Sequence, residues 1–156
     1  MEKSVLIPIA EGIEEIEAVT LIDVLRRAGA QVTVAAVDTL QITASRGVKL
    51  VADQRLAQCR EEIFDLIALP GGVPGAEHLG ESPELQEMLK KQNERSGLIG
   101  AICAAPALVL AAQGLLAGRQ ATCHPAFSHL LPVKEKIETR VVVDGHIITS
   151  RGPGSA

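Results

Sequence analysis

The chain has 156 residues, of which 47% are hydrophobic and 22% charged, and its formal net charge is −4. This length and balance predict one soluble globular domain, and its core must be aliphatic because only 1% of the residues are aromatic. The acidic balance and the absence of a basic run argue against nucleic acid as a partner. No apolar stretch reaches the ~18 residues that cross a bilayer, so no membrane partner is expected either.

The three cysteines indicate a reducing compartment rather than a disulfide framework. Cys59, Cys103 and Cys123 form an odd, sparse set without a CxxC pair, which is typical of a reducing environment, and we expect a cytoplasmic protein. Residues 1–4 lead straight into an apolar run, so no signal peptide is expected. No metal site is expected, because ligand spacing is missing among the scattered histidines His78, His124, His129 and His146.

Apolar periodicity predicts alternating strands and helices. In chain order, the first half is predicted to form a strand at 4–10, a helix at 14–28 ended by Gly29, a strand at 31–37, a short strand pair at 42–43 and 48–51, and a strand at 63–69. The second half is predicted to form a helix capped by Ser82 with Pro83 in its first turn, a strand at 98–102, a helix-forming run at 105–112, and a hairpin of 140–143 and 146–149.

This alternation predicts βαβ units and a largely parallel sheet, in an α/β fold. Ligands of such sheets bind at the carboxyl ends of the strands. Three features of the sequence follow strands there: residues 11–17, the pair Gly71-Gly72, and Cys103. We therefore expect these features to meet at one edge of the sheet.

Cys103 is the candidate nucleophile, because it stands between a predicted strand and a helix-forming run in the small-residue segment 101–106. A sharp turn at that position lifts the side chain above the sheet edge and aims backbone N–H groups at whatever it attacks. The alternative is a small buried hydrophobe, as free cysteines often are. Gly71-Gly72 could supply an oxyanion with an N–H group, although Pro-Gly-Gly is also ordinary turn chemistry.

Glu17 is the candidate acid or base. Helical spacing places it on the apolar face with Ile13, Leu21, Val24 and Ala28, where a carboxylate tends to stay protonated or to find a partner. A protonated Glu17 could donate to a thiolate, while the alternative is a rim carboxylate favoured by the helix dipole. His124, in a predicted loop, is the best histidine candidate for proton transfer, against the alternative of a surface histidine.

The order of these motifs resembles the ThiJ/PfpI superfamily, on the branch that contains the Parkinson's-disease-linked protein deglycase and its bacterial relatives. The matching runs extend over nearly the whole chain, at 11–17 (EGIEEIE), 44–48 (ASRGV), 69–72 (LPGG), 101–106 (AICAAP), 123–125 (CHP) and 149–154 (TSRGPG). The resemblance implies a single domain over 1–156, a flavodoxin-like three-layer sandwich and a homodimer.

The resemblance also assigns roles. It implies that Cys103 is the reactive, oxidation-prone cysteine, that Glu17 is a protonated glutamate in contact with it, and that Gly72 and Ala104 donate to an oxyanion. His124 matches a nearby histidine, and Arg46 and residues 150–153 match the surroundings of the pocket. The implied activity is the cofactor-free conversion of methylglyoxal-type α-oxoaldehydes to hydroxy acids, together with removal of early glycation adducts from proteins.

Three alternatives and one departure stand beside this reading. A redox sensor or chaperone would use oxidation of the same Cys103, a cysteine peptidase of this superfamily would have a histidine where Ala104 stands, and a glutamine amidotransferase would need a downstream His-x-Glu pair. The departure is that the chain ends at residue 156, where relatives continue into further helices. We therefore expect a C-terminally truncated domain with one sheet face left open.

Overall fold

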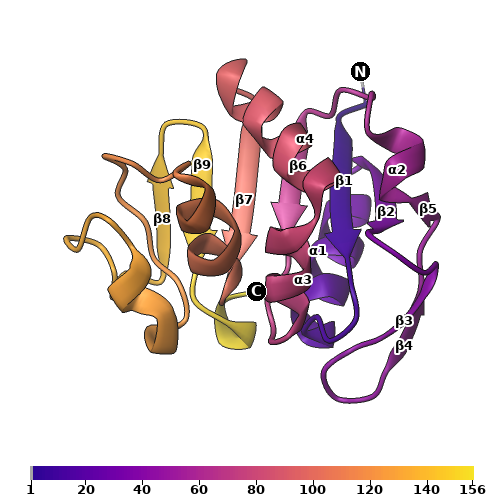
Figure 1. Ribbon diagram of the computed structural model, residues 1–156, viewed down its shortest axis with the longest axis horizontal. Coiled ribbons are helices and arrows are strands. Elements are labelled where there is room, and N and C mark those ends of the chain that lie inside the picture. The colour runs from indigo at the N-terminus through magenta and orange to yellow at the C-terminus, as the bar shows by residue number, and fades with distance from the viewer. Residues whose placement is uncertain (1) are drawn as a thin grey trace.

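The central feature of the fold is a mostly parallel sheet, seen in a computed structural model that describes residues 2–156. Its seven strands lie in the order β5-β2-β1-β6-β7-β9-β8 (Figure 1), and β8 alone runs antiparallel to its neighbour. The strands are β1 (Ser4–Ile9), β2 (Gln31–Ala36), β5 (Gln54–Arg55), β6 (Leu66–Leu69), β7 (Leu98–Ile102), β8 (Val141–Asp144) and β9 (Ile147–Ser150). A separate antiparallel hairpin consists of β3 (Gln41–Thr43) and β4 (Lys49–Val51).

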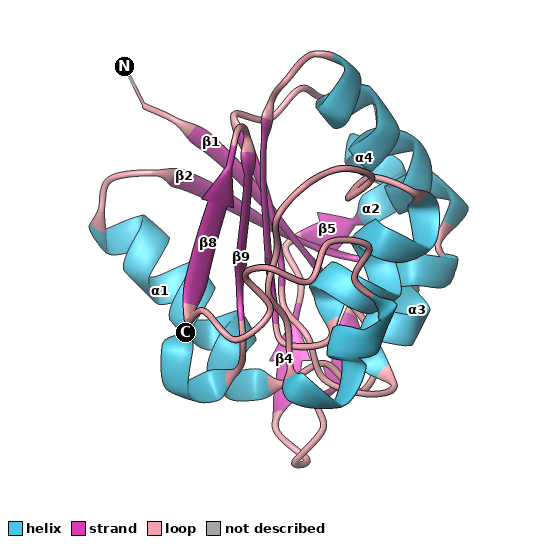
Figure 2. Cartoon of the chain, turned by 90° about the vertical axis from the view of Figure 1, so that its left-hand side faces the viewer, coloured by secondary structure: helices cyan, strands magenta, loops and turns pink. Residues whose placement is uncertain are grey.

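Helices cover both faces of this sheet. Figure 2 shows α1 on one side and α2, α3 and α4 on the other, so the chain forms three layers. The helices are α1 (Glu15–Arg27), α2 (Leu56–Cys59), α3 (Gly75–Glu81) and α4 (Pro83–Glu94), followed by a π-helical segment at Pro106–Leu110 and 3-10 turns at Ala111–Gln113, Pro125–Leu130 and Pro153–Ser155. This is the α/β architecture with a largely parallel sheet that the strand–helix alternation predicts, and it is the flavodoxin-like sandwich that the resemblance implies.

β1 is an interior strand of the sheet and lies in the core. It pairs with β2 on one edge and β6 on the other, and its side chains from Val5 to Ile9 are buried on both faces, as expected for a covered parallel strand. The core is aliphatic, as the composition predicts, and its largest members are leucines and isoleucines. Within residues 2–156, no helix combines the length and hydropathy that crossing a bilayer requires.

Several predicted boundaries are wrong for identifiable reasons. The strand predicted at 63–69 begins only at Leu66, because Ile63 is 72% exposed and the Asp65 side chain accepts the N–H of Ser4, which ties residue 65 to the start of β1. The run 105–112 is a π-helical segment followed by a 3-10 turn rather than an α-helix. The prediction also placed Val24 and Ala28 on the buried face of α1, whereas both are exposed.

Helix α3 escaped prediction because its sequence contains two glycines, which have low helix propensity. Both glycines are required by close packing. A Cβ atom at Gly75 would lie 2.4 Å from the backbone of Ile13, and one at Gly80 would lie 2.5 Å from the carbonyl oxygen of Leu108. Tertiary contacts therefore override local propensity here, and they bring α3 against the segment that carries the candidate site.

Candidate active site

Cys103 occupies the sharp turn that follows β7. Its φ is 66°, a left-handed conformation that costs energy for any residue with a Cβ atom and that often marks a functional position. The turn is held by backbone hydrogen bonds on both sides: Cys103 N donates to Ser150 O (3.0 Å) and Cys103 O accepts from His124 N (2.7 Å). The side chain is 8% exposed, which makes the thiol sheltered yet reachable.

The loop after β6 lies directly against this turn. A Cβ atom at Gly71 would be 2.6 Å from Cys103 Cβ and 2.9 Å from Ala104 N, so only glycine fits. Gly72 has a φ of 88°, and a Cβ atom there would be 2.5 Å from Glu14 N. The Pro-Gly-Gly sequence therefore allows three chain segments to meet at the carboxyl ends of β1, β6 and β7.

Glu17 comes from the first turn of α1 and is fully buried. Its N–H donates to the side chain of Glu14, the N-cap of the helix, and its Oε1 accepts from Gly71 N at 2.9 Å. Its Oε2 has no hydrogen-bond partner among the described residues. A buried, unpaired carboxyl oxygen is costly in a structural position, and this carboxyl interacts with the Cys103 thiol.

Burial governs the ionisation of both groups. Loss of hydration raises the pKa of Glu17, although the Gly71 N–H acts against it. Burial also raises the pKa of Cys103 to about 12, with a further contribution from the charge of ionised Glu17, whereas the N–H groups of Gly72 and Ala104 favour the thiolate. Because two adjacent negative charges repel, ionisation of one group opposes ionisation of the other, and a neutral Glu17 removes the repulsion that opposes the Cys103 thiolate.

His124 lies beside the site through its backbone. Its N–H holds the Cys103 carbonyl, while its Nδ1 accepts from Ala126 N at 3.1 Å in the next turn. The ring borders a surface hollow of about 460 Å³ that Arg140 and Arg151 also line. Arg151 donates to the carbonyl oxygen of Cys123 at 3.3 Å. The structure therefore brings His124 and the 150–153 segment next to Cys103 through backbone contacts, and within residues 2–156 no hydrogen bond joins the imidazole to the thiol.

Arg46 is positioned by Glu15, a residue that the sequence analysis passed over. The Glu15 carboxylate is 8% exposed and accepts from Arg46 N (2.9 Å), Ser45 Oγ (2.8 Å) and Val48 N (3.2 Å). The Arg46 side chain is exposed and contacts Ser45 O. Among residues 2–156, no hydrogen bond or ion pair joins its guanidinium to Cys103 or Glu17, and the contacts of Arg46 are with Glu15 and Ser45.

The remaining cysteines lie apart from this chemistry. Cys59 and Cys123 are both fully buried, and burial raises the pKa of each thiol. Within the described part of the chain, no group of three or more His, Cys, Asp and Glu side chains converges as metal ligands would. The site therefore consists of the Cys103 thiol, one buried carboxyl beside it and two backbone N–H groups.

Fold and site together define a class: an α/β flavodoxin-like protein with a cysteine on the strand-to-helix elbow of a parallel sheet. The chain belongs to the DJ-1/PfpI family, which residues 3–156 match. It is 54% identical over 153 residues to "Protein DJ-1 homolog B" of Arabidopsis thaliana, which is 97% of this chain and 35% of the plant protein. The chain thus spans between a third and two fifths of the plant relatives that it matches.

Shorter relatives match over most of their length. The "Glutathione-independent glyoxalase DJR-1.2" of Caenorhabditis elegans is 41% identical over 164 residues, which cover 99% of this chain and 83% of that protein. The solved structure described as "Toxoplasma gondii DJ-1, oxidized" superposes with a TM-score of 0.95 at 48% identity, covering 98% of this chain and 84% of that one. The resemblance and the fold class inferred from the sequence are confirmed.

Proposed function

We propose that this chain is a cysteine-dependent, cofactor-free glyoxalase that converts methylglyoxal-type α-oxoaldehydes to hydroxy acids. The observation that carries the proposal is the buried Glu17 carboxyl, whose Oε2 has no hydrogen-bond partner and which interacts with the Cys103 thiol. A relative named as a glutathione-independent glyoxalase supports it. Action on early glycation adducts of proteins belongs to the same proposal, because it needs the same thiol and the same proton carrier.

The proposed reaction consumes one aldehyde and one water molecule. The Cys103 thiolate attacks the aldehyde carbon, and the resulting hemithioacetal oxygen receives N–H donation from Gly72 and Ala104 and a proton from Glu17. Glu17 or His124 then removes the C1 proton to give an enediol and returns a proton to C2, which leaves a thioester. Water hydrolyses the thioester to lactate and regenerates the thiol, so no oxidant or reductant is needed.

The test is lactate formation from methylglyoxal without glutathione. We expect turnover by the wild type, a loss of at least about 10³-fold in Cys103→Ala, and unchanged turnover in Cys59→Ala, a control whose thiol is also buried but lies on α2. Circular dichroism establishes that each variant is folded. A folded wild type that makes no lactate, or a Cys103→Ala variant as active as the wild type, contradicts the proposal.

A redox sensor or chaperone is the second candidate, because the same Glu17 carboxyl could donate to a sulfinate formed on Cys103. The related Toxoplasma structure is described as oxidised. Mass spectrometry after peroxide treatment separates the two candidates. Oxidation confined to Cys103 in a chain without turnover favours the sensor, whereas turnover by the unoxidised protein favours the enzyme.

The same proposal includes a homodimer in the cytoplasm. Exposed apolar side chains on α1 and on the β3–β4 hairpin support self-association; these are Ile16 and Val19, and Val48 and Val51. The three cysteines are free thiols, which fits a reducing compartment. Sedimentation equilibrium tests the dimer, and Val19→Lys is expected to shift the mass toward the monomer.

A further inference from the structure

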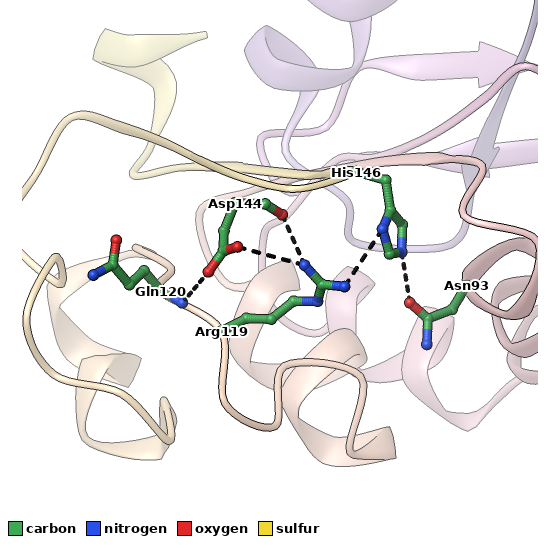
Figure 3. Close-up of polar contacts among 5 residues, drawn as sticks. All are labelled: Asn93, Arg119, Gln120, Asp144 and His146. Carbon is green, nitrogen blue, oxygen red and sulfur yellow. Dashed lines mark hydrogen bonds and ion pairs between the residues drawn. The ribbon is translucent and has the colours of Figure 1, made fainter.

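A polar cluster lies at the turn between β8 and β9, at the other end of these strands from Cys103. Figure 3 shows its five members: Asn93 of α4, Arg119 and Gln120 of the preceding loop, and Asp144 and His146 of the turn. Asp144 Oδ2 accepts from Gln120 N at 2.8 Å. Arg119 Nη1 donates to the Asp144 carbonyl at 3.1 Å and lies 3.5 Å from its Oδ1. The side chains of Arg119 and Asp144 are 29% and 32% exposed.

His146 bridges this loop to α4, and its partners fix its tautomer. Its Nδ1 lies 3.5 Å from Arg119 Nη2, and its Nε2 lies 2.7 Å from Asn93 Oδ1. A guanidinium only donates, so Nδ1 must accept and therefore carries no proton. The single ring proton is then on Nε2, where it is donated to Asn93. The contacts on both sides require the neutral imidazole.

A second proton on His146 would be placed against a cation. It would convert Nδ1 into a donor facing the Arg119 guanidinium, so that the hydrogen bond is lost and two positive charges meet. Asp144 supplies the only carboxylate in contact with Arg119 within residues 2–156, and its Oδ2 is already held by Gln120. The group facing the ring from α4 is the uncharged amide of Asn93. Glu135 lies one contact further out, accepting from Gln120 Nε2.

The backbone of His146 anchors the sheet at the same point. Its carbonyl accepts from Ile99 N at 2.9 Å, at the start of the β7–β9 pairing. At the far end of that pairing, Ser150 O holds Cys103 N. The cluster therefore fastens the first residues of the strand whose last residue supports the elbow.

We propose that this cluster is a pH-sensitive latch: neutral His146 fastens the β8–β9 turn to Arg119 and α4, and protonation of His146 releases it. Burial, with help from Arg119, lowers the pKa of His146 below its usual value. Below the pKa of a free histidine, about 6.5, the unfolded chain binds a proton that the latched state excludes. The stability contributed by the latch is therefore complete at neutral pH and is lost as pH falls below about 6.5.

The first test compares unfolding by urea at pH 7.5 and 5.0 in the wild type, His146→Gln and His129→Gln. Glutamine keeps a donor and an acceptor but does not titrate, and His129 is an exposed histidine outside the cluster. On acidification, we expect the unfolding constant of the wild type to rise relative to His146→Gln, tenfold for each unit of pKa depression. His129→Gln should follow the wild type. Parallel curves for the wild type and His146→Gln would overturn the proposal.

The second test does not depend on the folding of a His146 variant. Titration of the His146 ring by NMR is expected to give a pKa below 6.5 in the wild type and a higher pKa in Arg119→Gln, because Asp144 is then left without its cation. Hydrogen exchange of the Ile99 amide, corrected for the intrinsic rate, should lose protection between pH 7.5 and 5.0 in the wild type. A wild-type pKa at or above 6.5, or unchanged Ile99 protection, overturns the proposal.

Discussion

The two ends of β7 and β9 treat polar groups in opposite ways. At the carboxyl end of β7, Cys103 has a positive φ and Glu17 has an unpaired, fully buried oxygen. At the other end, Arg119, Asp144 and His146 satisfy one another with geometry that only one protonation state permits. The strands are the same, so the difference belongs to the turns and helices attached to them.

This difference separates a site for chemistry from a device for stability. A satisfied cluster contributes to the free energy of unfolding, whereas an unsatisfied carboxyl and a strained nucleophile subtract from it. Burial of the surrounding aliphatic core compensates the free-energy cost of the unpaired Glu17 oxygen. The contrast predicts that equivalent changes at the two ends have unequal or opposite consequences.

The largest expected effect comes from adding one methyl group at each end. In Gly71→Ala the new Cβ atom meets Cys103 Cβ at 2.6 Å and Ile102 O at 2.8 Å, and neither atom can move without its backbone. We therefore expect the free energy of unfolding to fall by about 3 kcal/mol. In Gly97→Ala the new Cβ atom meets the Gln92 side-chain amide at 2.5 Å. This amide can rotate away and lose its hydrogen bonds, which should lower the free energy of unfolding by about 1–2 kcal/mol. Urea unfolding measures both, and equal losses would contradict the contrast.

Glu17→Gln is expected to have a smaller effect, with a defined pH dependence. Because burial raises the Glu17 pKa, the folded chain holds a proton that the unfolded chain releases above about pH 4.5. Wild-type stability therefore falls as pH rises through this window, by about 1.4 kcal/mol for each unit of displacement. Glutamine does not titrate, so the variant gains stability over the wild type toward neutral pH while it loses turnover.

This slope is opposite in sign to that of the latch. Ionisation of Glu17 lowers the free energy of unfolding as pH rises, and protonation of His146 lowers it as pH falls. Thermal unfolding of Glu17→Gln, His146→Gln and the double variant between pH 4.5 and 7.5 should show two additive, opposed slopes, because the sites lie at opposite ends of the sheet. Slopes of the same sign would show that one carboxyl or one imidazole has been assigned the wrong ionisation.

The smallest effect is expected for an exposed ion pair on α1, which serves as a reference for the changes at the two ends of β7 and β9. Asp23 and Arg27 form a pair on α1 at 3.0 Å, with side chains 56% and 78% exposed. Screening by water limits such pairs, so Asp23→Asn should change the free energy of unfolding by no more than about 0.5 kcal/mol at any pH above 5. A larger change would mean that surface charges rival the two clusters in importance.

Sequence periodicity predicted every strand of the sheet except the two-residue edge strand β5, but it did not predict all of the helices that cover the sheet. The strand at 98–102, the N-cap at Ser82 and the hairpin about Asp144-Gly145 are where the patterns predict them. Helix α3 and the π-helical segment were beyond reach, because close contacts with Ile13 and Leu108 decide them. Helical spacing found Glu17 yet misplaced Val24, since α1 covers its face of the sheet along only part of its length.

The site residues were predicted better from the order of the motifs than from the chemistry of single residues. Cys103, Glu17, Gly72 and Ala104 meet as the resemblance implies, because a parallel sheet gathers the residues that follow its strands. Glu15 and His146 gave no signal, since their partners lie 30 and 53 residues away and pair with them only through the tertiary fold. The one available indication for Glu15 was its place inside the matching run 11–17.

The interior place of β1, between β2 and β6, has a consequence for biosynthesis. β2 follows soon after β1, but Ser4 and its partner Asp65, the residue before β6, are 61 residues apart in sequence. At about 5–20 residues per second, a ribosome needs ~3–12 s to supply the second neighbour. During that interval this apolar strand has an open edge, which is a template for pairing with another chain.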